Sequence, residues 1–460
     1  MSIHYNIFLI FLVLANSNCN KAGASAIASA NYNYYVDSQM GDDSNNGSHD
    51  RPFRSLDKVN SLRLHAGDSL LFKRGSSFDG YLKIRYSGTA EKPIIVTSYG
   101  SQQLSLPKFT NSSFTGDNFG NCIRLQGSHI EVDGLFFYNT LSLPDDFPSK
   151  SFLTVWQIGA VYIDTNATRC TIRNVEIEDC VVGIKSYGKE IVIQNNYIHD
   201  CNRVLAKWGW GPIGIWLGAD YQEVSNNRIF NYRAEDSRIS WGSGIGGGAD
   251  GGAIEIDDAR RNKTHISIHH NFTRDCQGFM EVTQHDVTSN PVYEGFRIHH
   301  NISDDYQQFI ALWDGSKCKI ENNTIVRRKV NVNDWGVFNI TEQNSKNLIR
   351  NNIIVVEKNI PIFNVGLRMT RHPENMISNN LYFAASGSLV MGYEGPGINP
   401  VYGDPAFKNY SDPVTAEDYN LTPGSAAIDK GINTGYLVDF ENTTVPNGSA
   451  ADIGAFEYVK

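Results

Sequence analysis

The segment IVIQNNYIHDC, residues 191–201, decides the fold, because its pattern returns along the middle of the chain. Apolar and polar residues alternate, an asparagine interrupts them, and the alternation then resumes. Segments of the same form are IRNVEI (172–177), SNNRI (225–229), HHNFT (269–273), HHNIS (299–303), ENNTI (321–325), RNNII (350–354) and SNNLY (378–382). The shortest spacing, 22 residues between Asn301 and Asn323, indicates one bare coil, and the longer spacings indicate coils with inserted loops.

A period of two residues predicts short β-strands rather than amphipathic helices. Asparagine tolerates the left-handed backbone conformation of a tight turn. Its amide can also hydrogen-bond to the same residue one coil away, as in the side-chain ladders of stacked strands. The repeat therefore predicts an all-β protein, a parallel β-helix solenoid with a continuous ladder of asparagines.

The composition agrees with one long soluble repeat domain. The chain has 460 residues, of which 41 are glycine, 41% are hydrophobic and 19% are charged, and its net charge is −9. A pI of about 5.7 argues against a broad nucleic-acid-binding surface, and a mean hydropathy of −0.33 argues against a polytopic membrane protein. A solenoid also grows beyond the usual size of a single-core domain without splitting.

The N-terminus carries a short apolar run, residues 7–15 (IFLIFLVLA), which is too short to span a bilayer. Residues 1–30 are predicted to be a signal peptide, so we expect a secreted protein without stable membrane insertion. Six cysteines would remain: Cys122, Cys170, Cys180, Cys201, Cys276 and Cys318. Three of them close the similar segments VEIEDC, YIHDC and FTRDC, which favours stacked buried thiols over disulfides.

Both ends of the mature chain resemble those of pectate-lyase-like right-handed parallel β-helix proteins. The N-terminal resemblance lies in residues 34–62 (YYVDSQMGDDSNNGSHDRPFRSLDKVNSL) and 67–82 (GDSLLFKRGSSFDGYL). The C-terminal resemblance lies in 403–410 (GDPAFKNY), 418–431 (DYNLTPGSAAIDKG) and 452–458 (DIGAFEY). It implies a carbohydrate-active protein, with a cap and first coils in 31–105, the β-helix in 106–395, and a C-terminal segment, 396–460, packed on the last coils.

Each coil has a further strand after the turn that follows the asparagine strand. These read GIKSY (183–187), GIWLG (214–218), AIEID (253–257), FMEVT (279–283), FIALW (309–313), VFNIT (337–341) and IFNVG (362–366). Because side chains alternate between faces, the central apolar residues are expected to face the core. They are Ile184, Ile215, Ile254, Met280, Ile310, Phe338 and Phe363. Their neighbours are expected to face solvent: Lys185, Trp216, Glu255, Glu281, Ala311, Asn339 and Asn364.

This alignment places Glu255 beside Glu281 on adjacent coils, about 4.8 Å apart. Such a spacing is close to the roughly 5–5.5 Å that separates the two carboxyl groups of a retaining glycosidase. Like charges opposed on a sheet are destabilising, so a shared proton, a bound cation or a catalytic role should offset the cost. Asp257 and Asp258 follow at the end of the strand, and we predict these four carboxylates as the catalytic group. The alternative is a charged face that only keeps the sheet soluble.

Aromatic residues near these carboxylates indicate a sugar-binding cleft, since aromatic faces can stack on sugar rings. The predicted substrate-binding residues are Trp216, Trp313, Trp241, Trp210, His285, Asp314 and Lys185. The glycine-rich run 242–252 (GSGIGGGADGG) lacks the lysine and the helix of a phosphate loop, and we interpret it as a lip of the cleft. The histidines beside the ladder asparagines (His199, His269, His270, His299 and His300) are predicted to be structural stacks.

Three functions remain open at this stage. The first is a secreted polysaccharide-degrading glycoside hydrolase, for which the sequence indicates no cofactor with certainty. The second is a polysaccharide lyase, for which the resemblance implies a lysine or arginine base and calcium. Lys185, Lys207, Arg260 and Arg261 are the candidate bases, and Glu255, Asp257 and Asp258 the candidate calcium ligands. The third is a glycan-binding module or adhesin without catalysis.

Overall fold

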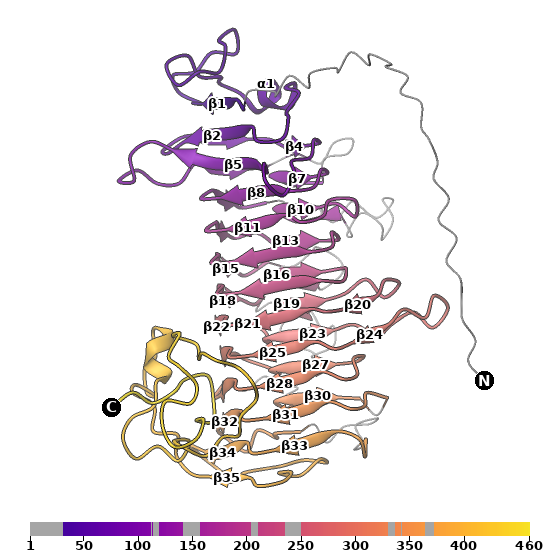
Figure 1. The fold of residues 1–460 in the computed structure, drawn as a ribbon, viewed down its shortest axis with the longest axis vertical. Helices are drawn as coiled ribbons and strands as arrows, with labels where there is room; N and C mark the ends of the chain where they lie inside the picture. Colours follow the sequence, from indigo (N-terminus) through magenta and orange to yellow (C-terminus); the bar gives the residue numbers. More distant parts are fainter. Residues whose placement is uncertain are drawn as a thin grey trace, which may run out of the picture. The chain divides into compact units, whose positions relative to one another are not determined.

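The strands of the protein stack coil upon coil into parallel sheets (Figure 1). The computed structural model describes residues 31–111, 113, 119–140, 157–203, 210–234, 250–329, 336–341, 343–363 and 372–460, without the side chains of residues 210 and 250. Residues 31–460 form one compact unit. Each complete coil contributes one strand to each of three sheets, which we number in the order in which the chain passes through them.

The first sheet leads into the asparagine turn. Its strands, in spatial order, are β1 (Asn33–Val36), β2 (Ser69–Lys73), β5 (Ile94–Tyr99), β8 (Ile130–Asp133), β11 (Thr171–Arg173), β14 (Ile191–Gln194), β17 (Gln222–Ser225), β21 (Ser267–His269), β25 (Arg297–His299), β28 (Lys319–Glu321), β31 (Leu348–Arg350) and β33 (Met376–Ser378).

The second sheet follows the turn. Its strands are β3 (Ser77–Asp79), β6 (Lys108–Thr110), β9 (Phe136–Tyr138), β12 (Glu176–Glu178), β15 (Tyr197–Cys201), β18 (Arg228–Tyr232), β22 (Phe272–Arg274), β26 (Ile302–Asp304), β29 (Thr324–Arg327), β32 (Ile353–Val356), β34 (Leu381–Ala384) and β35 (Val401–Tyr402).

The third sheet carries the predicted glutamate pair. Its strands are β4 (Leu82–Ile84), β7 (Ile123–Leu125), β10 (Val161–Ile163), β13 (Val182–Ser186), β16 (Trp210–Leu217), β19 (Asp250–Ile256), β23 (Met280–Val282), β27 (Ile310–Leu312) and β30 (Phe338–Ile340). A short pair, β20 (Lys263–Thr264) and β24 (Tyr293–Glu294), projects beside it. The parallel pairing confirms the predicted all-β, parallel β-helix class.

Helical structure is sparse in the described residues. The short helix α1 (Leu56–Asn60) lies in the N-terminal cap, and a 3-10 helix, η2 (Ala416–Tyr419), lies in the C-terminal segment. Ser55 caps α1 by accepting a hydrogen bond from the Lys58 backbone N–H at 3.1 Å. Across the ranges described, no helix has both the length and the apolar character needed to cross a membrane.

The predicted asparagine ladder is present and runs through the turns between the first and second sheets. In each step one amide donates to the next side-chain oxygen; the Asn227 Nδ2 to Asn271 Oδ1 distance is 2.9 Å and the Asn271 Nδ2 to Asn301 Oδ1 distance is 3.0 Å. The ladder members are all buried: Asn196, Asn227, Asn271, Asn301, Asn323, Asn352 and Asn380. Because each oxygen also accepts a backbone N–H from the neighbouring coil, the ladder ties consecutive turns together.

The structure corrects one detail of the prediction. The sequence analysis expected the same asparagine to adopt the left-handed turn conformation and to form the ladder hydrogen bonds. The left-handed conformation belongs to the residue before the ladder asparagine, and its φ lies between 49° and 57° in these turns. This explains the Asn-Asn doublets, in which the first residue turns the chain and the second forms the ladder. Asn174 takes the turning position, with φ 51°, and Val175 occupies the place of the ladder residue in that coil.

The predicted histidine stacks are confirmed for the later coils. The rings of His269 and His299 stack with their centroids 4.9 Å apart, and those of His270 and His300 at 5.2 Å. Burial lowers the pKa of His270 to about 4, so this imidazole is neutral near pH 7. His270 and His300 thereby replace the turning asparagine in two coils without adding charge.

All six cysteines that follow the N-terminal segment are buried, free thiols. Burial raises the pKa of Cys170 and of Cys180 to about 11, which keeps both protonated. The cysteines are therefore buried thiols rather than disulfides, as the sequence analysis favoured.

The C-terminal segment packs against the outer face of the second sheet (Figure 1). Phe230, Phe272 and Ile302 on the sheet share an apolar cluster with Tyr419 and Phe456. The Tyr419 hydroxyl donates to Asp304 Oδ2 at 2.8 Å. The outer face of this sheet is therefore apolar where the segment covers it.

Asn271→Ala should destabilise the fold, because it leaves the Asn227 backbone N–H and the carbonyls of Val224 and His269 without their partners. We expect a loss of about 3 kcal/mol in the free energy of unfolding, measured by urea titration. The control is Asn226→Gly in the neighbouring turn, where the residue is exposed and has a φ of 57°, which suits glycine. Equal losses in the two variants would show that the ladder carries no special stability.

Candidate active site

The predicted alignment of the third sheet is confirmed residue by residue. Lys185 pairs with Trp216, Trp216 with Glu255, and Glu255 with Glu281. Glu281 pairs in turn with Ala311, and Ala311 with Asn339. We call these six residues the outer column. Their apolar neighbours, from Ile184 to Phe338, are buried in the core as expected.

The two glutamates therefore lie on adjacent parallel strands with their side chains on one face. Neighbouring strands are about 4.8 Å apart, so the two carboxylates are within reach of one substrate bond. Both side chains are partly buried. Trp313, one coil further on, donates its indole N–H to Glu281 Oε1 at 2.8 Å. This hydrogen bond orients the Glu281 side chain.

The expectation that the outer column faces solvent is wrong for four of its members. Lys185, Trp216, Ala311 and Asn339 are buried, although their positions alternate with those of the core residues. The ammonium group of Lys185 lies over the Trp216 ring and 5.9 Å from the centre of the Tyr187 ring. Trp216 is therefore a packing partner of Lys185 and cannot offer an open ring face as the sequence analysis expected.

The electrostatics of the site are dominated by burial. Burial lowers the pKa of Lys185 well below its usual value, although Asp257, Glu255 and Asp258 oppose the shift. Burial also raises the pKa of Asp257 to about 6, against the backbone N–H of Asp258 and the positive field of Lys185. The site therefore holds a carboxyl group that keeps its proton in weakly acidic solution and an amine that loses its charge readily.

The loop that follows β19 is held in a constrained conformation. Asp258 has a φ of 75°, and its carboxylate pairs with the Arg261 guanidinium at 2.7 Å. Lys263 Nζ donates to the carbonyls of Asp258 and Arg261, both at 2.9 Å, and the Tyr293 hydroxyl donates to the Asp258 carbonyl at 3.2 Å. Asp258 is thus engaged in holding the loop, and its catalytic role stays a prediction.

Lys263 and Tyr293 are site residues that sequence reasoning missed. Both lie on the small β20–β24 pair, outside the repeating strands, so no register linked them to the glutamates. Both side chains are buried. Burial lowers the pKa of Lys263 to about 8.

The structure brings His285 and Asp314, two of the predicted substrate-binding residues, into contact. The His285 ring nitrogen Nδ1 contacts Asp314 Oδ2, and the Gly315 backbone N–H donates to Asp314 Oδ1 at 2.9 Å. The His285 ring also meets the Tyr293 ring edge-on at 6.1 Å. His285 therefore borders the loop that holds Asp258.

Some predicted residues lie outside the described part of the chain. They are Trp241, Lys207, Asn364 and most of the glycine-rich run, together with the side chain of Trp210. A cavity of about 300 Å³ lies elsewhere, between the turn of β17 and β18 and the C-terminal segment. Its lining includes Arg228, Phe272 and Glu417 and none of the outer column.

Comparison with known proteins gives the family. A family model described as chondroitinase B matches residues 56–365. This chain belongs to the chondroitinase B family. A lacto-N-biosidase of Bifidobacterium longum subsp. longum is 26% identical over 340 residues, which are 61% of this chain and 20% of that protein. The chain thus spans about a fifth of the length of this relative.

Solved structures support the fold of this chondroitinase B family member. XylC in complex with xylose has a TM-score of 0.53 at 12% identity, over 93% of this chain and 98% of XylC. Pectate lyase Pel9A has a TM-score of 0.50 at 14% identity, over 93% of this chain and 97% of the lyase. The likeness to Pel9A confirms the predicted pectate-lyase-like fold.

Lys263→Met should loosen the loop after β19, because the carbonyls of Asp258 and Arg261 lose their shared charged donor. We expect a loss of about 2 kcal/mol in the free energy of unfolding by urea titration. Lys319→Met, at an exposed position of β28, is the matched control and should change it by less than about 0.5 kcal/mol. If the two substitutions cost the same, Lys263 does not hold the loop.

Proposed function

We propose that this protein is a glycoside hydrolase that degrades a polysaccharide or oligosaccharide. The observation that carries the proposal is the pairing of Glu255 with Glu281 on adjacent strands. A spacing near 4.8 Å suits a retaining mechanism, whose two carboxyl groups are roughly 5–5.5 Å apart. The similarity to a lacto-N-biosidase supports a glycan substrate.

The surroundings of the two glutamates differ, and this difference assigns their roles. Glu281 accepts the Trp313 indole N–H, which holds its side chain in place, so we assign it as the nucleophile at the anomeric carbon. Glu255 lies directly opposite and is assigned as the acid that protonates the leaving oxygen and then activates water. Asp257, which directly follows β19, holds a proton below about pH 6 and is assigned as a hydrogen-bond donor to the bound sugar.

The reaction then balances in two steps. In the first, the Glu281 carboxylate forms a bond to the anomeric carbon while the glycosidic bond breaks and the leaving oxygen takes the proton of Glu255. In the second, Glu255 accepts a proton from water, and the resulting hydroxide displaces Glu281 from the sugar. The product keeps the anomeric configuration of the substrate.

We also propose that the protein acts outside the cytoplasm. The apolar run 7–15 supports export, because its length and position are those of a signal peptide.

Glu255→Gln and Glu281→Gln should each lower kcat on a glycan by at least about 100-fold, because each removes a group needed in the transition state. An aryl glycoside with a good leaving group should restore the first step in Glu255→Gln and leave Glu281→Gln inactive, as followed by release of the aryl group. Glu223→Gln, a half-exposed glutamate of the first sheet, is the control and should keep full activity. Unchanged activity in both site variants would contradict the two-glutamate mechanism.

Hydrolysis should weaken as the pH rises through about 6, because Asp257 is protonated below this value and a carboxylate above it. In Asp257→Asn this alkaline limb of the kcat profile should disappear, because the amide donates a hydrogen bond at every pH. A profile that keeps the same limb in Asp257→Asn would remove Asp257 from the mechanism.

The second candidate is a polysaccharide lyase, favoured by the lowered pKa of Lys185 and by the family. Desolvation makes the Lys185 amine a base, and Glu255 with Asp257 would supply oxygen ligands for calcium. Product analysis separates the candidates, because β-elimination gives an unsaturated uronic acid that absorbs ultraviolet light. If Lys185→Met and a calcium chelator each abolish this absorbance, the protein is a lyase. Binding to glycans with no turnover would instead indicate the binding module.

A further inference from the structure

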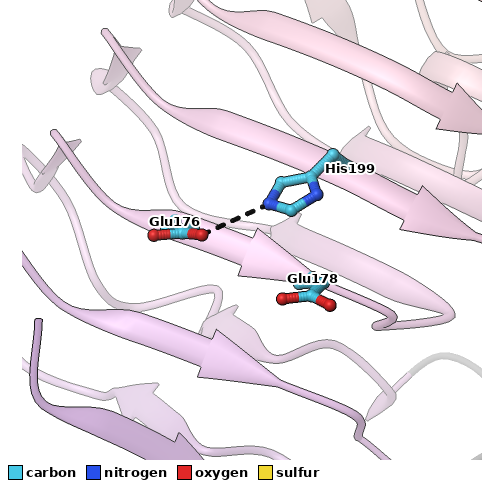
Figure 2. Close-up of side chains that lie close together, drawn as sticks. All are labelled: Glu176, Glu178 and His199. Atoms are coloured by element: carbon cyan, nitrogen blue, oxygen red, sulfur yellow. Dashed lines mark ion pairs between the residues drawn. The ribbon is translucent and has the colours of Figure 1, made fainter. Parts of the chain in front are cut away.

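A second group of titratable residues lies on the outer face of the second sheet, away from the glutamate pair. Glu176 and Glu178 project from β12, and His199 projects from β15 (Figure 2). His199 is in register with Glu178, and Glu176 lies two residues earlier on the same face. Each of the three offers one ligand atom within 4.8 Å of the other two.

The His199 imidazole is held with one nitrogen turned toward the carboxylates. Its exposed fraction is only 7%. Nδ1 lies 2.8 Å from Asp200 Oδ2, and the Asn231 amide donates to the other oxygen of Asp200 at 2.6 Å. The Tyr197 ring stacks on the imidazole with centroids 4.0 Å apart. These contacts leave the ring little freedom to turn away from β12.

The second nitrogen of His199, Nε2, faces the Glu176 carboxylate. It is shielded from solvent and makes no hydrogen bond to any described residue. Its contact with charge is the ion pair with Glu176 Oε1, at 3.4 Å (Figure 2). Glu176 is thus the partner of this nitrogen, at a distance longer than a normal hydrogen bond, and both atoms can serve as metal ligands.

The contact between His199 Nδ1 and Asp200 Oδ2 favours one tautomer of the imidazole. An aspartate that accepts the Nδ1 proton leaves the lone pair on Nε2, which is the arrangement of metal-binding histidines backed by a carboxylate. Burial lowers the pKa of His199, but Glu176 and Asp200 outweigh burial and raise it. The same negative field that attracts a proton attracts a divalent cation.

We propose that Glu176, Glu178 and His199 form a site for a divalent transition metal, with Zn²⁺ the best match. Zinc binds imidazole nitrogen and carboxylate oxygen in four-coordinate sites, and water would complete the set. Calcium and magnesium prefer sites made only of oxygen ligands, so the imidazole disfavours them. The ion would join β12 to β15 and act as a clamp between consecutive coils, without a part in the reaction at Glu255 and Glu281.

The chain contains a natural control for this site. His269 Nε2 lies 3.4 Å from Glu223 Oε1, the same distance as in the His199–Glu176 pair. However, the His269 Nδ1 atom contacts the His270 ring, and no second carboxylate completes a described metal group there. If both contacts were simple ion pairs, substitution of His199 and of His269 would have the same effect on Zn²⁺ binding. If only the first is a metal site, only the substitution of His199 would abolish binding.

The experiment is calorimetric titration of the chelator-treated full chain with ZnCl₂, for the wild type and four variants. The wild type should bind one Zn²⁺, and Glu178→Gln and His199→Asn should lose the binding. Asp200→Asn, which keeps all three ligands, should weaken it by about 10–100-fold. His269→Asn should bind as the wild type does, and far-UV circular dichroism checks that each variant is folded.

Two further measurements separate a metal site from an ion pair. Zn²⁺ should raise the Tm of the wild type and of His269→Asn but not that of His199→Asn, because only a site present in the folded state stabilises it. Co²⁺ should give visible absorption bands that Zn²⁺ displaces. Absence of Zn²⁺ and Co²⁺ binding in the wild type, or equal affinity in the wild type and His199→Asn, would overturn the proposal and leave His199 as an imidazolium paired with Glu176.

Discussion

The buried asparagine ladder is the constraint on which the other features depend. Each ladder amide satisfies its own hydrogen-bonding groups and a backbone N–H of the adjacent turn, so neighbouring coils can meet in only one register. A slip of one residue would move every inward side chain to the outer face. The ladder lies between the first and second sheets, yet the register that it sets is inherited by the third sheet. The pairing of Glu255 with Glu281 follows from it.

The outer faces of the sheets have different environments, although every coil is built alike. On the second sheet, the C-terminal segment covers an apolar face that includes Phe230, Phe272 and Ile302. Earlier on the same sheet, β12 and β15 carry charged side chains instead. The third sheet carries the outer column, with buried Lys185 and Trp216 beside partly buried glutamates. A solenoid can thus place separate chemistry on separate faces without changing its core.

The charged groups around Glu255 and Glu281 destabilise the folded state, and neighbouring residues offset part of this destabilisation. Two carboxylates in register repel one another, and a buried lysine loses its hydration. Lys263 places positive charge beside Asp257, Trp313 donates to Glu281, and Arg261 neutralises Asp258. Several destabilising charged side chains that lie together and are held by specific contacts are typical of a functional site rather than of a solvated face.

The amino-acid sequence alone determined the class of fold, the inward-facing residues and the Glu255–Glu281 register, because a strict repeat converts sequence position into spatial position. It could not separate the turning asparagine from the ladder asparagine, since adjacent residues of one type carry the two roles. Only the tertiary structure decided that Lys185 and Trp216 are buried, that Asp258 is held by Arg261, and that Lys263 and Tyr293 support the loop. These contacts arise between inserts and strand ends, whose conformation the repeat does not specify. For the same reason, the sequence predicted only a structural stack for His199, and only the structure showed Glu176 and Glu178 beside its Nε2 atom.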